Sequence, residues 1–484
     1  MLPFLLNISV ITTIPVEVSP QIAQVVVPQP IPQEVRPAPE ELPAPFVMPS
    51  QEIVQPREIR SLPGTLDNVP VFNSNSPEVV RTEGILLSTF SPQGMRNPQA
   101  HLNYSFKGRF DLFTHHITQA RTQAETRSMM QGIIMYNPGR EAVRLEILEA
   151  ASYLTRPDAL FIDLPDYVDN PLGNVFSGPG SRVMSDILRG VRQGTWLPLM
   201  TIPPGHVQML LNLPIPAGTV VPTSNTRSTY MRLRSSGAIN LANLAMYAPR
   251  NPNGRERFPT LEEWQRLLIN GNLAGPRDLR PSPMTNTKNR GDVIYGRVAG
   301  VAIGSEWQSQ VTDRPGSGSL TIPQPGSAFS YGLSTLYDGS LGSGQVQTAR
   351  LAVRYQDTAY EAHGNYGIKY NLSLPLQNKT NQNQRVTVAI ETPLKVDEPR
   401  AELLFFARPE RRVFFRGTVR LRFRDDAGFP QTRYVHLVQR RGQQGEPLVT
   451  LSMPPGDRRV VQVEFLYPPD ATPPQVLTVR TLRR

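Results

Sequence analysis

The sequence predicts a mainly β protein, made of two or more antiparallel β-sandwich-like modules, a few short helices and a disordered proline-rich amino-terminal segment. Proline is frequent, with 49 residues among 484, and charged residues make up only 19%, which favours short strands joined by turns over long helices. Runs of alternating apolar and polar residues recur from Ser61 onward, as is typical of half-buried strands. A single core rarely serves more than about 300 residues, so a chain of this length indicates several modules.

The composition also limits the chemistry that the chain can perform. It contains no cysteine, which excludes disulfides, thiolate metal sites and cysteine nucleophiles. Its formal net charge is +10, and all but five of its 50 basic residues are arginine. Because arginine presents a planar fork of donors to carboxylates and phosphates, this bias favours an anionic partner without indicating which one.

The first 58 residues are expected to lie outside the modules. Residues 1–24 carry no charge before Glu17 and contain a short apolar stretch, so they indicate either an atypical signal peptide or an unstructured leader. The stretch is shorter than the roughly 20 residues of a membrane-spanning helix, and we expect no transmembrane helix. Residues 25–58 are rich in proline, which predicts an extended spacer, with a proline ligand for a partner domain as the alternative.

A short phrase with a histidine near its start occurs twice. Residues 100–107 read AHLNYSFK, and residues 362–369 read AHGNYGIK. Each phrase starts an apolar alternation and is followed by an asparagine turn and a second alternating strand. This favours related β-rich modules over residues 59–250 and 291–484, the second including a carboxyl-terminal antiparallel sheet, joined by a helix and linker over residues 251–290.

The two histidines of this phrase, His101 and His363, have two interpretations. They could converge on one metal or catalytic site. The shared alternation after each phrase favours an architectural role instead, in which nearby backbone satisfies each imidazole. In the first module, Asn137-Pro138-Gly139 between two strand-like runs predicts a hairpin.

Two helices are expected between the strands. The run SRVMSDILRGV, residues 181–191, places its apolar residues on one helical face, with Ser181 as the expected cap. The run TLEEWQRLLING begins with Thr260 and Glu263 in the spacing of a capping box. The glycine-rich turn before the first helix lacks the lysine and the spacing of a phosphate loop, so we expect an ordinary turn there rather than an anion site.

The clearest pattern is RRVFFRGTVRLRFRDDAGF, residues 411–429. Apolar and arginine residues alternate there, so one face of the predicted strand enters a core and the other carries basic side chains. The arginines expected on the outer face are Arg412, Arg416, Arg420, Arg422 and Arg424. They predict either a solvated face paired with acidic neighbours or a polyanion-binding surface whose affinity falls with salt. Aromatic residues that could stack on bases are sparse, which argues against dedicated nucleic-acid binding.

Other polar clusters match metal sites less well. His115 and His116 are adjacent, and neighbours on a strand point to opposite faces, so they cannot readily chelate one ion. Asp163, Asp166 and Asp169 are weak calcium candidates, because their spacing differs from that of an EF-hand loop. We expect no cofactor and assign no catalytic residue, although a carboxylate pair can assemble in space without a local signature.

Several long phrases resemble one protein family, in the same order. They are PGTLDNVPVFNSNSPEVVRTEGILLSTF, GPGSRVMSDILRG, YGRVAGVAIGS, HGNYGIKY, FFRGTVRLRF and LYPPDATPPQVLTV. Over about residues 58–484 the chain resembles the cyanobacterial family DUF3370, a domain of unknown function. The resemblance implies a cyanobacterial source and a place in the cell envelope, in the periplasm or outside the cell. It carries over no catalytic or ligand residue.

These observations predict a non-enzymatic cell-envelope protein that binds or scaffolds, and whose arginine face contacts an anionic polysaccharide or another envelope component. The alternative is a carbohydrate-active enzyme with paired carboxylates in a cleft between the modules. Carboxylates about 5 to 10 Å apart in an open groove would favour the enzyme, and a continuous arginine face would favour the binder.

Overall fold

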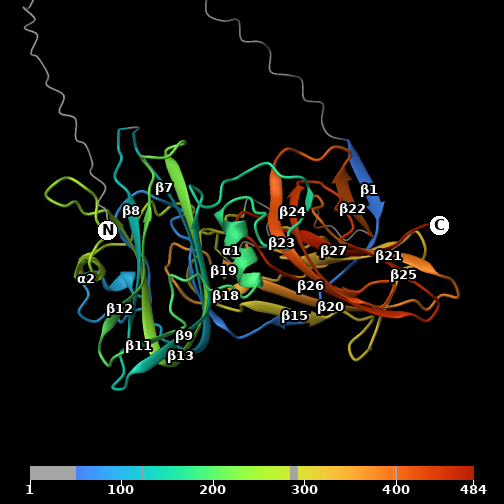
Figure 1. Ribbon diagram of the computed structural model, residues 1–484, viewed down its shortest axis with the longest axis horizontal. Helices are drawn as coiled ribbons and strands as arrows, with labels where there is room; N and C mark the ends of the chain where they lie inside the picture. The colour runs from blue at the N-terminus through green and yellow to red at the C-terminus, as the bar shows by residue number, and fades with distance from the viewer. Residues whose placement is uncertain (1–50, 123, 284–292, 396, 398–400, 484) are drawn as a thin grey trace, which may run out of the picture. The chain divides into compact units, whose positions relative to one another are not determined.

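The structure is a computed structural model, and it describes residues 51–122, 124–283, 293–395, 397 and 401–483. The expected leader and most of the expected proline-rich spacer lie outside these residues. Within them the chain forms 27 strands and two α-helices, which confirms the mainly β fold class (Figure 1).

The strands of the first sandwich form one 12-stranded sheet that bends back on itself. They are β4 (Pro70–Ser74), β5 (Val79–Val80), β6 (Gly84–Ser88), β7 (Phe106–Gln119), β8 (Met129–Tyr136), β9 (Val143–Leu154), β11 (Leu199–Ile202), β12 (Val207–Ile215), β13 (Ser224–Tyr247), β14 (Ala299–Ile303), β18 (Ala349–Arg354) and β19 (Glu361–Ala362). Strand β13 pairs first with β7 and β9 and, beyond a bulge after Ser235, with β6 and β8. The two resulting layers enclose a core that includes Phe110, Ile133 and Leu233.

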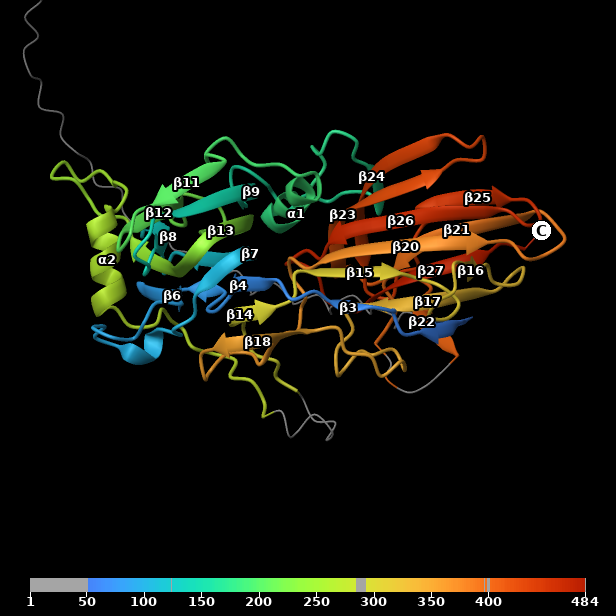
Figure 2. The same cartoon turned by 90° about the horizontal axis from the view of Figure 1, so that it is seen from below.

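The second sandwich packs an eight-stranded sheet against a five-stranded one. The larger sheet contains β3 (Thr65–Leu66), β10 (Tyr167–Asp169), β15 (Glu306–Gln310), β16 (Leu320–Thr321), β20 (Lys369–Gln377), β23 (Val413–Arg424), β24 (Pro430–Arg440) and β26 (Arg458–Leu466). The smaller contains β2 (Glu58–Arg60), β17 (Ala328–Leu333), β21 (Gln384–Glu391), β25 (Val449–Met453) and β27 (Gln475–Thr481), and β1 (Glu52–Pro56) pairs separately with β22 (Glu402–Phe406). Figure 2 shows β23, β26, β20 and β15 side by side.

The two sandwiches share both a sheet and a core. Strands β14 and β18, which follow the expected 251–290 linker, extend the sheet of the first sandwich because β14 pairs with β4. The opposite face of that sheet adds Phe113, Ala151 and Tyr230 to the core of the second sandwich. Helix α1, Pro179–Leu188, packs against β9 and β13 of one sandwich and against β23 and β26 of the other (Figure 1). Strands from both sides of the expected linker therefore meet in one sheet.

The two sandwiches repeat one arrangement of strands. The turn at Asn137 joins β8 to β9, yet β8 pairs with β12 and β13 while β9 pairs with β11 and β13. The expected hairpin is therefore wrong: the turn is an arch between two facing layers. The turn at Asn378 joins β20 to β21 in the same way. Beside each arch, a Pro-Pro-Gly turn forms a second arch, from β11 to β12 and from β25 to β26.

One asparagine side chain ties each pair of arches together. In both sandwiches its Nδ2 donates to three backbone carbonyls, one within its own turn and two in the neighbouring arch. The acceptors are Glu141, Ile202 and Pro203 for Asn137, and Gln382, Met453 and Pro454 for Asn378. In both, Oδ1 accepts from the backbone N–H two residues further on, at 2.9 Å. The same bonds at corresponding positions support the interpretation of the modules as related.

The repeated histidine phrase also adopts one backbone turn in both places. Asn103 and Asn365 have φ angles of 52° and 51°, in the left-handed region that asparagine tolerates better than most residues. His363 Nε2 lies 2.8 Å from a backbone carbonyl oxygen, as expected, whereas His101 Nδ1 lies 2.8 Å from the hydroxyl of Ser88. The two histidines therefore have separate, structural partners.

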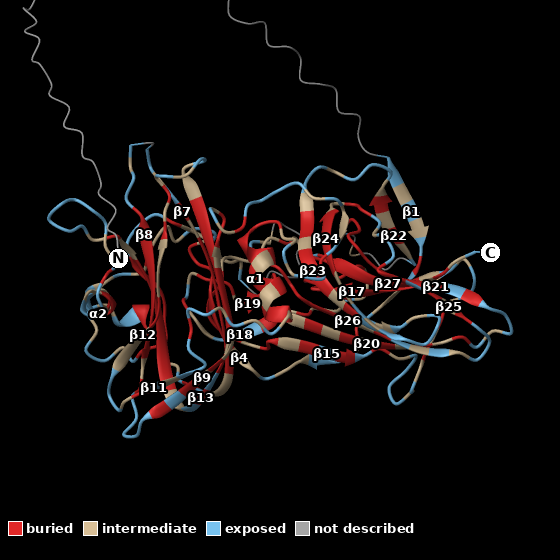
Figure 3. Ribbon diagram, in the orientation of Figure 1, coloured by how far each residue is buried: buried red, intermediate tan, exposed pale blue. Residues whose placement is uncertain are grey.

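The helices differ in how well the sequence predicts their starts. Helix α2, Leu261–Asn270, begins with the expected capping box of Thr260 and Glu263. The expected cap of α1 is wrong: the cap is Gly178, because α1 already begins at Pro179 and Ser181 lies inside it. Trp264 of α2 is fully buried against the first sandwich. Figure 3 shows β7 and β8 of that sandwich coloured mostly as buried. Neither helix of the described residues is long and apolar enough to cross a membrane.

Candidate polyanion-binding face

Strand β23 carries the predicted arginines on the outer face of the eight-stranded sheet. Alternate residues of a strand face opposite sides, and Phe415, Val419 and Leu421 are fully buried in the core. The even-numbered positions from 416 to 424 therefore lie on the other face, between β24 and β26. This alternation is as the sequence predicts, but the burial of the arginines varies along the strand.

Arg420 is held inside the molecule. Its guanidinium donates two hydrogen bonds to Glu464, at 2.8 and 2.6 Å, and a third to the carbonyl of Leu188 at the end of α1, at 3.1 Å. Burial lowers the pKa of Arg420, but the hydrogen bonds with Glu464 and Tyr434 raise it overall. Arg420 therefore joins the sheet to α1 and has little capacity left for a ligand.

Arg416 is also covered, although its contacts are weaker. Its guanidinium lies 5.1 Å from the ring centre of Phe161, in the segment that leads to α1. Its Nε is buried without a hydrogen-bond partner among the described residues. Burial lowers the pKa of Arg416, an effect that the charge of Asp470 opposes. The inner half of the predicted arginine face is thus half-buried under neighbouring elements.

The outer half of the face is open to solvent. Arg422 and Arg424 are exposed; the first has its Nη2 3.6 Å from Glu464, and the second donates to the carbonyl of Gly428 at 2.9 Å. Exposed Arg458 of β26 shares this side of the sheet by strand alternation. We missed Arg458 in the sequence, although the alternation in RRVVQVEFL could have indicated it. Arg412 is exposed but precedes the bulge at the start of β23.

The calcium candidates contact arginines instead of one another. Asp163 and Asp166 lie beside Arg440, and Asp169 accepts a hydrogen bond of 2.9 Å from Arg433. In the part of the chain that the structure describes, no three histidine or acidic side chains gather as they would around a metal ion. Asp163, Asp166 and Asp169 therefore remain only weak calcium candidates.

His115 and His116 point to opposite sides of β7, as expected. His115 Nδ1 lies 2.8 Å from the hydroxyl of Ser228, and His116 Nδ1 lies 2.8 Å from the carbonyl of Pro77. Each imidazole thus has its own partner on its own side of the sheet, so the pair does not form a chelate.

Glu149, Glu306 and Glu464 are each paired with a cation. Glu149 lies 3.2 Å from Arg232, and Glu306 lies 3.2 Å from Lys369, which is 3.5 Å from Glu464. Burial raises the pKa of Glu149, and Arg232 opposes this effect. A glycosidase needs two carboxylates that reach a substrate in a groove. These carboxylates instead belong to an ion-pair network, which offers no support for the enzyme alternative.

A family comparison covers almost all of the described chain. The family described as "Protein of unknown function (DUF3370)" matches residues 57–481. The chain belongs to this family. No curated protein matches the chain. One similar solved structure is the crystal structure of procruciferin, an 11S globulin from Brassica napus, with 11% identity over 87% of this chain and 85% of that chain. Its TM-score of 0.10 is too low to carry an argument about fold or function.

In this DUF3370 protein, a row of polar side chains continues the open face across the sheet. Asn371 of β20 donates to Glu306 of β15 at 2.9 Å and accepts from Gln462 of β26 at 2.9 Å. Gln462 is also the register partner of Arg422. We call Arg422, Arg424, Arg458, Asn371 and Gln462 the open arginine face. It presents guanidinium forks and amides on one side of one sheet.

Proposed function

We propose that this DUF3370 protein is a non-enzymatic binding or scaffolding protein of a cyanobacterial cell envelope, and that it contacts an anionic polysaccharide through the open arginine face. One observation carries the proposal. Three exposed arginines share this face, and among the described residues only Arg422 has a carboxylate within 4.0 Å. Arg424 and Arg458 are left with charge that a ligand could neutralise.

The chemistry of the face suits an acidic sugar polymer. Guanidinium groups bind carboxylate and sulfate groups through paired hydrogen bonds, and the amides of Asn371 and Gln462 can bond to sugar hydroxyls. Mutual repulsion of the arginines would be relieved by an anionic chain, so binding should weaken with salt. The ion-pair network around Glu464 holds the inner end of the face in place.

The place in the cell is proposed from the sequence and the family. The DUF3370 resemblance favours a cyanobacterial source and an exported protein, and the proline-rich residues 25–58 would hold a body away from an anchor. Fractionation of native cells, followed by detection of the protein in envelope and cytosolic fractions, tests this part. Recovery of the protein in the cytosol alone would contradict it.

Binding is tested with two matched triple variants. The first removes the open arginines through Arg422→Gln, Arg424→Gln and Arg458→Gln. The control removes three exposed arginines of the first sandwich and its connecting loops through Arg140→Gln, Arg144→Gln and Arg255→Gln. Both variants lose three positive charges, so they differ only in where the charge is lost. Wild type and both variants are titrated with polygalacturonate, and with neutral dextran, at about 20 and about 200 mM NaCl.

The wild type and the control should bind polygalacturonate at low salt, and the open-face variant should bind at least about tenfold more weakly. None of the three proteins should bind dextran, which carries no charge. Thermal melts verify that both variants fold. Equal loss of affinity in both variants would show an unspecific response to net charge, and equal binding by all three proteins would remove the open face as a binding site.

A further inference from the structure

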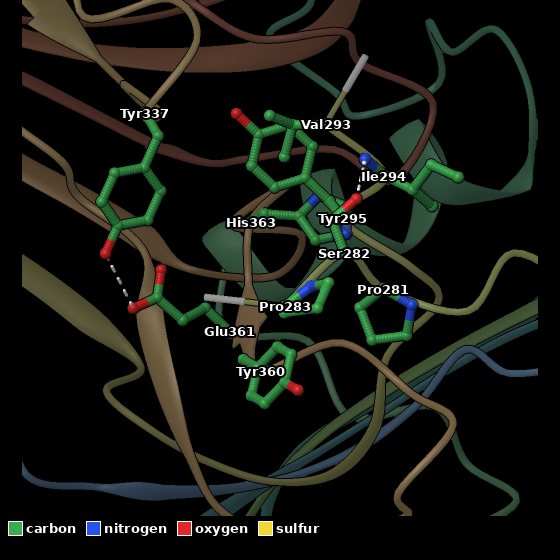
Figure 4. A pocket seen from close by; sticks show the side chains of 10 residues that line it. All are labelled: Pro281, Ser282, Pro283, Val293, Ile294, Tyr295, Tyr337, Tyr360, Glu361 and His363. Carbon is green, nitrogen blue, oxygen red and sulfur yellow. Dashed lines mark hydrogen bonds between the residues drawn. The ribbon is translucent and has the colours of Figure 1, made fainter. Parts of the chain in front are cut away.

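A hollow lined by tyrosine rings lies away from the open arginine face. Tyr295 precedes β14, Tyr337 follows β17, and Tyr360 and Glu361 lie at the start of β19. Figure 4 shows these side chains around one space, with the carboxylate of Glu361 turned toward the hydroxyl of Tyr337. The cavity volume is about 30 Å³, and the cavity is partly enclosed. Three segments that are far apart in the sequence thus build one site.

The wall of this hollow is apolar except for a few groups. Proline, valine and isoleucine side chains line it between the aromatic rings (Figure 4). The only charged side chain of the lining is Glu361, which is 91% buried, since its residue exposure is 9%. Its carboxylate accepts hydrogen bonds from the hydroxyls of Thr348 and Tyr337. Within the described residues it forms no ion pair, which leaves a buried negative charge beside aromatic rings.

The one histidine of the wall, His363, adds no positive charge at neutral pH. His363 stacks on Tyr295 with ring centres 4.9 Å apart and bonds through Nε2 to a backbone carbonyl. Burial lowers the pKa of His363; the backbone hydrogen bond opposes this, and the charges of Arg297 and Lys395 lower it further. The imidazole is therefore neutral at pH 7, so it does not repel a cation.

The lining selects between ligand classes. A sugar ring needs many hydrogen-bond partners, which this mostly apolar wall does not offer, whereas a methylated ammonium group needs aromatic faces and a counter-charge. Arg354 already places its positive charge 3.8 Å from the ring centre of Tyr360, which disfavours a second cation on that ring. His363 covers only one face of Tyr295 and adds no positive charge, so Tyr337 and the other face of Tyr295 are available to a ligand. We propose that this hollow binds the head group of a compact organic cation, a quaternary or alkyl ammonium, between Tyr295, Tyr337 and Glu361.

A variant at the neighbouring Arg350 should change the affinity for a cation in the opposite sense to a variant at Glu361. It is the register partner of Glu361 across β18 and β19, and its charge acts on Tyr337. Because a nearby positive charge opposes a bound cation, removal of Arg350 should strengthen binding, while removal of Glu361 should weaken it. A general loss of structure would weaken binding in both variants.

The probes are choline and its uncharged analogue 3,3-dimethyl-1-butanol, in which carbon replaces the quaternary nitrogen. Binding to the full chain is measured by saturation-transfer NMR and calorimetry. The variants are Glu361→Gln, Arg350→Gln and Tyr337→Ala, and the control is Glu446→Gln, which makes the same charge change at an exposed position. Thermal melts follow the fold; Tyr337 is 39% exposed, so its truncation should be tolerated even if Glu361→Gln is unstable.

We expect choline to bind the wild type and the control equally. Glu361→Gln and Tyr337→Ala should weaken binding by about tenfold or more, and Arg350→Gln should strengthen it by about two- to fivefold. The neutral alcohol should bind at least about tenfold more weakly than choline. Equal binding of the two probes, unchanged affinity in a folded Tyr337→Ala protein, or no binding of choline by the wild type would overturn the proposal. None of these outcomes bears on the open arginine face, whose residues and probes are different.

Discussion

Four of the six histidines are buried and a fifth, His363, is half-buried, and burial lowers the pKa of each of these five. It lowers the pKa of His101, His116 and His436 to about 4, and that of His115 and His363 in the same direction. His436 illustrates the cause, because its Nδ1 lies 3.3 Å from the hydroxyl of Thr418 while its Nε2 is buried without a partner among the described residues. A proton on such a ring would have to be buried with it, so the folded state favours the neutral form.

The free energy of unfolding should therefore fall as the pH drops from about 6.5 toward 4. An unfolded histidine titrates near 6.5; because the folded pKa is lower, the unfolded state binds more protons in this window and gains stability from acid. Each such histidine removes up to about 1.4 kcal/mol per pH unit there. Urea denaturation at pH 7 and pH 5 measures the slope for wild type, His436→Gln and the exposed-site control His206→Gln. The His436 variant should show a smaller slope, and a slope equal to that of the wild type would contradict the argument.

At the scale of elements, a pair of arches joins the two facing layers in both sandwiches. In each pair of arches, three backbone carbonyls lie beside the asparagine side chain, one in its own turn and two in the neighbouring arch. Buried carbonyls need hydrogen-bond donors. Asn137 and Asn378 supply those donors with one side chain each. The paired layers therefore depend on one residue at the point where the chain crosses between them.

Asn378→Ala should lower the free energy of unfolding by about 2 to 4 kcal/mol, because it leaves buried carbonyls without donors. Asn137→Ala should have an effect of the same size, since its hydrogen bonds correspond one by one. Asn381→Ala, at an exposed position of the same turn, is the control and should change stability by less than about 0.5 kcal/mol. Urea denaturation of the three variants gives the comparison, and a neutral Asn378→Ala would refute the role of the arch asparagine.

At the scale of the whole molecule, the two sandwiches are joined by more than a linker. Phe113 and Tyr230 of the first sandwich belong to the core of the second, and α1 contacts strands of both. The Arg420 bond to the end of α1 adds a polar contact at the same place. Opening one sandwich alone would expose part of this shared core to water.

We therefore expect the two sandwiches to unfold together. Hydrogen exchange with mass spectrometry, in increasing sub-denaturing urea, should give peptides from β8 and β9 the same opening free energy as peptides from β20 and β21, within about 1 kcal/mol. Peptides from α2, which covers an outer face only, serve as an internal reference for local opening. Two separate midpoints would instead support independent modules with the boundaries expected near residues 250 and 290.

The sequence by itself determined those features that depend on neighbours along the chain. The alternation in β23, the capping box at Thr260 and the opposite directions of His115 and His116 follow from the periods of strands and helices, and each is present in the structure. The twofold AH-x-NY phrase indicated related modules, and its asparagine adopts the same left-handed conformation in both places, a conformation that asparagine tolerates better than most residues.

Only the tertiary structure decided what faces each strand from elsewhere in the chain. Alternation placed Arg420 and Arg422 on one side of a sheet, but the packing of α1 on that side covers most of the first and leaves the second in solvent. The turn at Asn137 is an arch and not a hairpin because its two strands find other partners. The tyrosine-lined hollow joins residues 295, 337 and 361, which no local pattern connects. The physical reason is the same in each case. Periodicity is a property of a few consecutive residues, whereas burial and strand pairing depend on contacts between residues that are far apart in the sequence.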